Sequence, residues 1–177
     1  MLRKIRKLIH FYLLRKELKF HQVERKVVNL RDAREIGLLF DASDTDVASQ
    51  VNLFAESLRK ERKKIFMLGY YNFPKPAINL HFPYFNRKNV TWYYEPNGLL
   101  VEEFIARKFD ILISAHIEEN LPLEYISTMS QSTFRVGQYD KNKTYAYDFM
   151  IDLKDLTPKE RIDNRIKKFS AMGFFEE

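Results

Sequence analysis

The chain has 177 residues, which is the usual length of one compact domain, and no cysteine, which excludes disulfides, thiolate metal ligands and cysteine nucleophiles. Hydrophobic residues make up 45% and charged residues 31%, a composition typical of globular rather than disordered or membrane-spanning proteins. The formal net charge of +6 indicates an anionic partner. The missing cysteines fit a reducing compartment, and we expect a cytoplasmic protein.

The positive charge is concentrated at the N-terminus. Residues 1–34 hold 11 Lys or Arg against 3 Asp or Glu, whereas residues 35–177 hold 19 against 21. The rest of the chain is therefore slightly acidic. We expect two regions, a basic N-terminal helical extension at residues 1–34 and a single α/β domain at residues 35–177.

The first residues form the pattern of a basic amphipathic helix. At 100° per residue, one apolar stripe covers about 140° of the helix surface. It contains Leu2, Ile5, Leu8, Ile9, Tyr12 and Leu13. A second stripe, formed by Phe11, Leu14 and Leu18, points away from the first. The apolar run 8–14 is too short for a secretory signal and no small-residue cleavage site follows it.

Three interpretations of this helix remain open beside the simplest one, in which one stripe packs on the domain and the cations face water. We predict that the cations contact phosphates of nucleic acid, with RNA or a ribonucleoprotein as the expected partner. These cations are Arg3, Lys4, Arg6, Lys7, Arg15, Lys16 and Lys19. The alternatives are an anionic membrane surface, or a protein partner bound through Phe11, Leu14 and Leu18. The second stripe favours nucleic acid, because membrane-surface helices usually present one clean apolar face.

After residue 34, short apolar runs alternate with helical patterns, which predicts an α/β fold. We expect strands at 36–40, 65–70, 91–94, 109–115, 133–137 and 145–151. Helices are expected from Ser43 or Asp44, at 99–108, at 121–130 and from Thr157. These elements predict a three-layer, mostly parallel Rossmann-like sheet. The last strand is expected to form an antiparallel edge hairpin with the one before it.

In such a sheet, ligands bind beyond the carboxyl ends of the strands. Two loops there carry candidate ligand residues, Asp41 and Asp44 in the first and His116 and Glu118 in the second. They are suited to a small ligand or a metal-dependent enzyme. Capping of the next helix is the stronger interpretation for the first loop, and a solvated loop for the second. No catalytic motif is present, so we expect a non-catalytic binding module with no catalytic residue, cofactor or metal site.

Aromatic residues are numerous, with 15 Phe, 10 Tyr and 1 Trp. Many lie in segment 66–94, interleaved with basic residues, where they could stack on unpaired bases or contact a protein partner. Burial is the more common role for such rings. In that interpretation Phe66, Phe82 and Trp92 belong to the core.

Three phrases carry a resemblance to a known family: GLLFDAS at 37–43, FDILISAHIEENLPLEYISTMSQSTFRVGQYD at 109–140, and YDFMIDL at 147–153. With the order of elements, they resemble an uncharacterised family of short bacterial α/β proteins, known only as a domain of unknown function. The resemblance covers most of the chain and implies an α/β fold without an assigned activity. Separately, residues 109–137 are similar in layout to the N-terminal half of heptosyltransferase-type glycosyltransferases.

Overall fold

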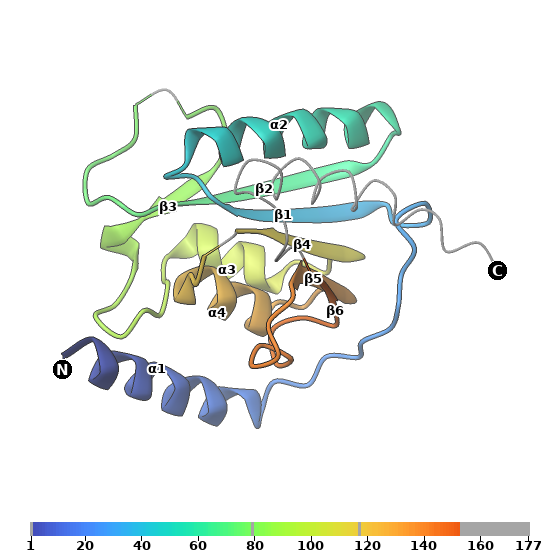
Figure 1. Cartoon of the computed structure of the whole chain (residues 1–177). Coiled ribbons are helices and arrows are strands. Elements are labelled where there is room, and N and C mark those ends of the chain that lie inside the picture. The colour runs from blue at the N-terminus through green and yellow to red at the C-terminus, as the bar shows by residue number, and fades with distance from the viewer. Residues whose placement is uncertain (1, 79, 117, 153–177) are drawn as a thin grey trace.

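The computed structural model describes residues 2–78, 80–116 and 118–152 (Figure 1). Its elements in chain order are α1 (Leu2–Leu18), β1 (Glu35–Asp41), α2 (Thr45–Lys60), β2 (Lys64–Tyr71), β3 (Tyr84–Asn86), the 3-10 turn η1 (Arg87–Asn89), α3 (Leu99–Ala106), β4 (Ile111–Ala115), α4 (Leu121–Met129), β5 (Phe134–Gln138) and β6 (Phe149–Ile151). The helix expected from Thr157 falls outside the described residues.

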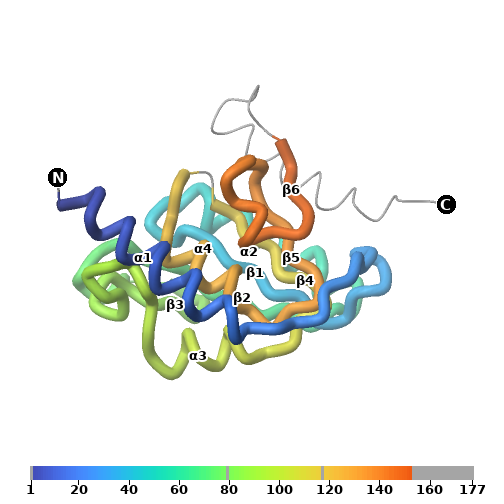
Figure 2. Tube along the Cα trace, turned by 90° about the horizontal axis from the view of Figure 1, so that it is seen from below, coloured from blue at the N-terminus to red at the C-terminus, as the bar shows by residue number. Residues whose placement is uncertain are grey.

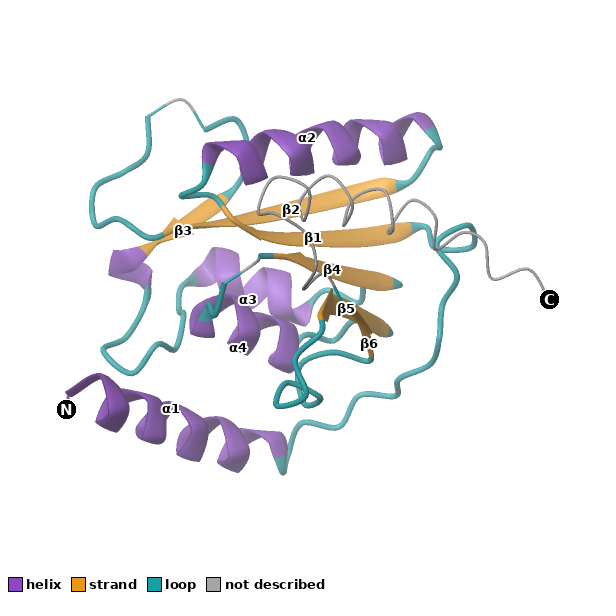
Figure 3. Cartoon of the chain, viewed as in Figure 1, coloured by secondary structure: helices purple, strands orange, loops and turns teal. Residues whose placement is uncertain are grey.

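The strands form one sheet in the order β3-β2-β1-β4-β5-β6, and every pair of neighbours is parallel (Figure 3). The expected α/β fold with a Rossmann-like parallel sheet is confirmed. From β1 the chain adds β2 and β3 on one side and then returns to place β4 on the other. The chain direction across the sheet therefore reverses between the neighbouring strands β1 and β4. In folds of this kind, ligands bind in the crevice beyond the carboxyl ends of the strands at this topological switch point.

Helices cover both faces of the sheet, with α2 on one side and α3 and α4 on the other (Figure 1). The central strands β1 and β4 are apolar along most of their length because both of their faces are buried. Leu38 and Phe40 point into the α2 layer, while Leu39 packs with Leu123 of α4. Alternate residues of one strand thus supply two separate cores.

The expected antiparallel edge hairpin is wrong, because β6 pairs with β5 in parallel. Residues 139–148 carry the chain back along the sheet before β6 begins. Arg135 fixes this return: its guanidinium forms an ion pair of 2.8 Å with Asp148 and donates to the carbonyl of Tyr145 at 2.9 Å. Within this segment the backbone N–H of Lys143 donates to the carbonyl of Asp140 at 2.9 Å and closes a turn that does not join adjacent strands directly.

The strand expected at 91–94 is also wrong, since the third strand of the sheet is β3, at 84–86. Thr91 instead closes a tight turn, in which its backbone N–H donates to the carbonyl of Glu95 at 2.8 Å and Tyr94 adopts a φ of 69°. Residues 91–94 have the aromatic composition typical of a strand but do not form one. Phe66 and Phe82 pack against the core as expected, whereas Trp92 is 57% exposed.

Helix α1 is the outermost element beneath α3 and α4 (Figure 1), and Figure 2 shows it from that side. It docks through its second apolar stripe: Leu14 is 2% exposed, and the ring of Phe11 meets that of Tyr145 edge-on. His10 is buried beside them, with its Nδ1 3.0 Å from the carbonyl oxygen of Tyr93. Glu17 accepts a hydrogen bond of 2.7 Å from the Tyr125 hydroxyl of α4. The sequence left open which stripe packs on the domain, and the structure buries the second one.

The segment between α1 and β1 is also anchored to the body. Leu30 and Ala33 belong to the core beneath α2. The Lys63 ammonium donates to three backbone carbonyls in the same turn, at 2.6 to 3.0 Å. Residues 1–34 therefore contribute buried surface, so single substitutions test α1 better than deletion does. None of the helices in the described part of the chain is both long and apolar enough to cross a membrane.

A buried ion pair joins α4 to the return segment and yields a first prediction. Glu124 is 1% exposed and accepts from the Lys143 ammonium at 2.7 Å. Lys143→Met leaves an uncompensated buried carboxylate, so we expect it to lower the free energy of unfolding by about 3 kcal/mol. The double variant Glu124→Gln/Lys143→Met removes that charge and should recover most of the loss. Urea denaturation measures both, with exposed Lys141→Met as the matched control within about 0.5 kcal/mol of wild type. Equal losses in single and double variants would contradict this reasoning.

His10 makes the docking of α1 dependent on pH. Burial lowers its pKa below the ordinary value of 6.5, while the Tyr93 carbonyl and the carboxylates of Glu124 and Glu17 oppose that shift. Its Nε2 is buried without a hydrogen-bond partner among the described residues, so protonation would add a donor that nothing accepts. A lowered pKa means that the unfolded state takes up the proton first, and stability falls as pH drops below about 6.5.

We expect amide hydrogens of α1 to lose protection from exchange between about pH 7.5 and 5.5, after correction for the intrinsic exchange rate. His10→Gln removes the titrating group and should abolish this pH dependence. Unchanged protection of the wild-type helix across the range would show that His10 does not control docking.

Candidate functional site: a pocket between α1 and the carboxyl ends of the strands

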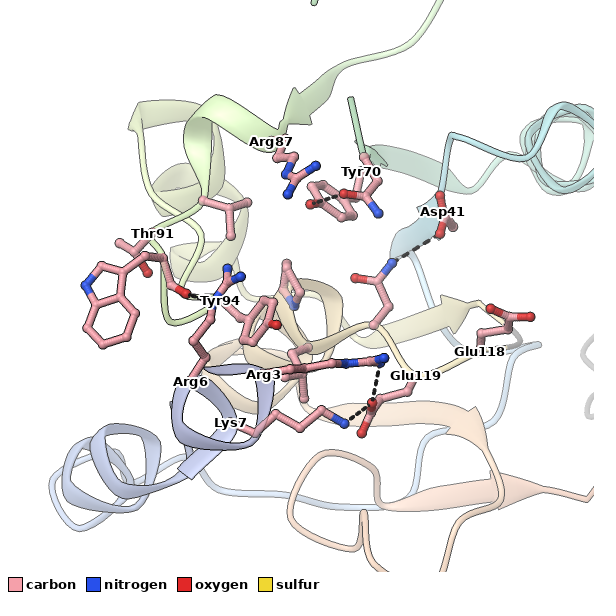
Figure 4. A pocket seen from close by; sticks show the side chains of 16 residues that line it. Arg3, Arg6, Lys7, Asp41, Tyr70, Arg87, Thr91, Tyr94, Glu118 and Glu119 are labelled. Atoms are coloured by element: carbon pink, nitrogen blue, oxygen red, sulfur yellow. Dashed lines mark hydrogen bonds and ion pairs between the residues drawn. The ribbon is translucent and has the colours of Figure 1, made fainter. Parts of the chain in front are cut away.

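A pocket of about 590 Å³ lies at the topological switch point (Figure 4). Its walls come from the ends of β1 and β2, the segment after β3, the loop before α4, and the first turns of α1. Ligand pockets typically have volumes of about 300 to 1,000 Å³, so a small molecule fits here. Its charged lining residues are Arg3, Arg6, Lys7 and Arg87 together with Asp41, Glu118 and Glu119.

The turn from β1 to α2 does not offer the usual phosphate site of a Rossmann fold. It contains no glycine, and Asp44 caps α2 by accepting from the backbone N–H groups of Asp46 and Val47 at 2.9 and 3.2 Å. The helix N-terminus that would hold a phosphate is thus already occupied by a carboxylate. The turn after β1 therefore offers no free helix N-terminus to an anion, and the cations of the pocket are on side chains.

Asp41 connects the two sides of the switch point. One carboxylate oxygen accepts from the backbone N–H of Ser43 at 2.9 Å, and the other accepts from the side-chain amide of Asn120 at 3.2 Å. Asn120 caps α4 and its own backbone N–H donates to Glu124. The end of β1 and the start of α4 are therefore held in a fixed relation along the pocket floor.

Helix α1 supplies cations that are partly engaged by the protein itself. Lys7 and Arg3 share one carboxylate: Lys7 forms an ion pair with Glu119, and Arg3 lies 3.9 Å from the same group (Figure 4). Arg6 donates to the backbone carbonyl of Trp92, and its guanidinium lies 4.4 Å from the centre of the Tyr94 ring. Two cations on one carboxylate leave an excess of positive charge beside the pocket.

The opposite wall carries Arg87, a cation without a hydrogen-bond or ion-pair partner among the described residues. Arg87 is exposed and lines the pocket, and its guanidinium makes no hydrogen bond or ion pair with any residue that the structure describes. Beside it, the Tyr70 hydroxyl donates to the side-chain oxygen of Asn72 at 3.0 Å. Burial raises the pKa of Tyr70 to about 12, so this phenol stays neutral near pH 7. Arg87 and Tyr70 lie close together in Figure 4.

The fold joins two groups of residues that the sequence presents as separate candidates. Arg3, Arg6 and Lys7 meet Asp41 and Glu118 around one pocket. Asp44 acts as a helix cap. His116 lines a smaller neighbouring pocket with Glu118, and its Nε2 lies 2.9 Å from the Tyr147 hydroxyl. Lys4, Arg15, Lys16 and Lys19 are exposed and do not line the pocket.

Sequence reasoning misses Tyr70, Asn72, Arg87 and Asn120 as lining residues. Tyr70 is the last residue of a strand that the sequence predicts and Asn72 follows it closely, so their position at the carboxyl end of that strand could have been inferred. Arg87 carries no such signal, because β3 was not recognised. Within the described ranges, no group of three or more carboxylate or imidazole side chains is arranged to hold a metal ion.

Comparisons with known proteins place the chain in a family. A search of curated proteins and a search of solved structures each found no match. The likeness of residues 109–137 to heptosyltransferase-type glycosyltransferases has no support in these comparisons. The model of a family of unknown function, DUF6913, matches residues 6–169, which includes most of α1 as well as the sheet. The chain therefore belongs to the DUF6913 family of unknown function, as the resemblance to an uncharacterised α/β family implies.

Proposed function

We propose that this protein binds a small ligand carrying a phosphate group in the pocket between α1 and the carboxyl ends of the strands. The observation that carries the proposal is the position of Arg87, whose guanidinium has no hydrogen-bond or ion-pair partner among the described residues and lies on the wall opposite the cations of α1. Guanidinium groups bind phosphate through two parallel hydrogen bonds, and charge-assisted bonds of this kind are about twice as strong as neutral ones.

The remaining lining suits the rest of such a ligand. Asn72 and Thr91 provide hydrogen-bonding groups, and Tyr70 provides an aromatic ring with a neutral hydroxyl. These groups can orient a polar molecule without reacting with it. We propose binding rather than catalysis, and a cytoplasmic location, where small phosphorylated molecules are abundant.

Nucleic-acid binding remains a prediction of the sequence. Of the seven cations expected to contact RNA, Arg3, Arg6 and Lys7 contact protein groups, while Lys4, Arg15, Lys16 and Lys19 stay exposed. Arg3, Arg6 and Lys7 line a concave pocket, which favours a small ligand over nucleic acid as the partner of these three cations.

Isothermal titration of the full chain with inorganic phosphate, pyrophosphate, AMP and ADP tests the proposal. We expect at least one of these to bind with a Kd below about 1 mM, and Arg87→Met to weaken that binding about tenfold or more. Lys88→Met is the matched control, since Lys88 is exposed on the same turn but does not line the pocket. Failure of all four probes to bind, or equal losses in the two variants, would contradict the proposal.

A second variant changes affinity in the opposite direction. Glu119→Gln removes the carboxylate that Lys7 and Arg3 share, and so frees two cations for the ligand. We expect it to tighten phosphate binding several-fold, because the ligand no longer competes with a protein carboxylate. A carboxylate that only held α1 in place would give the reverse, a weaker binding, when removed.

A further inference from the structure

The outward face of α1 combines exposed apolar side chains with cations. Leu2, Leu8 and Tyr12 are 71%, 70% and 70% exposed, and Ile5 is 45% exposed. At 100° per residue these four lie within about 120° of the helix surface. They are four of the six residues of the first apolar stripe, and they face away from the domain because His10 and Leu14 occupy the buried side.

The charges on this face are all positive. Lys4, Arg15, Lys16 and Lys19 are exposed around the stripe and past its C-terminal end. The helix has one acidic residue, Glu17, which is half-buried and bonded to Tyr125 of α4. An apolar stripe bordered by lysine and arginine, with no exposed carboxylate, matches an interface that is apolar inside and anionic at its surface.

We propose that α1 docks the protein on an anionic membrane surface, with Leu2, Ile5, Leu8 and Tyr12 entering the interface and the four cations contacting lipid headgroups. The helix is the outermost element on its side of the molecule, so its length is accessible to a flat surface (Figures 1 and 2). The second stripe, which made the helix unlike a membrane binder in sequence, is covered by the body of the protein.

Two other partners fit this face less well. Nucleic acid uses the cations but gains little from exposed leucine and isoleucine side chains, because its outer surface is phosphate and sugar. A second copy of the chain would bring the same cations against each other across a two-fold axis. Only a lipid surface uses both the stripe and the charges.

Co-flotation of the full chain with vesicles tests the proposal. Vesicles of phosphatidylcholine alone are compared with an equal mixture of phosphatidylcholine and phosphatidylglycerol. We expect binding to the anionic vesicles and little to the neutral ones, with the bound fraction falling as salt is raised. No binding to the anionic vesicles at low salt overturns the proposal.

Two pairs of variants separate the contributions of the stripe and the charges. Ile5→Ser/Leu8→Ser should lower the partition coefficient by roughly tenfold or more, and Lys16→Gln/Lys19→Gln should lower it about tenfold on anionic vesicles only. The matched controls are Leu53→Ser/Leu99→Ser and Lys60→Gln/Lys75→Gln, which remove exposed apolar or basic side chains from other elements. All eight side chains are exposed, so we expect an unchanged Tm.

The same variants identify the alternative partners. RNA binding that survives Ile5→Ser/Leu8→Ser, together with no vesicle binding, would assign the face to nucleic acid and overturn the membrane proposal. A concentration-dependent dimer that this variant dissociates, again without vesicle binding, would assign it to a second copy. Vesicle binding reduced equally by the control variants would show that the stripe has no specific role.

Discussion

The docking of α1 against α4 and the 91–95 turn is the interaction on which the rest of the site depends. His10 and Leu14 fix the rotation of the helix about its axis, since both are almost fully buried. With that rotation set, Arg6 and Lys7 are directed toward the pocket. The sheet and its connections supply the floor at the switch point and Arg87 on one wall, and α1 supplies the other cations. The pocket is therefore a joint product of a Rossmann-like sheet and a helix that precedes it in the chain.

The positive charge at the switch point comes from side chains that line the pocket, not from the N-terminus of the helix after β1. Many Rossmann folds hold phosphate at the N-terminus of the helix after β1, where glycines let the backbone approach closely. Here Asp44 occupies that terminus and stabilises the helix instead. Side chains on α1 and after β3 take over the positive charge. In the proposed binding mode, a phosphate group would displace Glu119 from Lys7 and Arg3.

The sequence was sufficient for the fold class because the strongest signals are local. Buried strands such as β1 and β4 are nearly continuous apolar runs, and Asp44 is an ordinary helix cap. The strand expected at 91–94 and the antiparallel pairing expected for the last strand failed for non-local reasons. β3 has three residues and is defined by pairing with Gly69–Tyr71, while β6 is placed by the ion pair between Arg135 and Asp148. Neither interaction produces a periodic hydrophobic pattern in the sequence that would predict it.

The sequence predicted the loop residues of the site and the cations of α1 separately, without predicting that they meet, because that contact is also non-local. Asp41 and Glu118 follow recognised strands, so a position at the carboxyl edge could be inferred for each. Arg3, Arg6 and Lys7 were recognised only as charge on a helix, because no local pattern reports which way a helix faces once it docks. Arg87 depends on β3 and was missed with it.

The two apolar stripes of α1 explain why its role could not be decided from composition. Either stripe could pack on the domain, and whichever stripe packs leaves the other one exposed to solvent. The buried position of His10 decides between them, since His10 lies on the side of Leu14 and opposite Tyr12. A histidine is an unexpected residue for that purpose, because burial disfavours its protonated form and lowers its pKa. The helix face that forms the pocket wall and the face left to solvent are thus set together by the burial of His10 and Leu14. Whatever weakens the docking of His10 disturbs the pocket's cations and the outward apolar stripe at the same time.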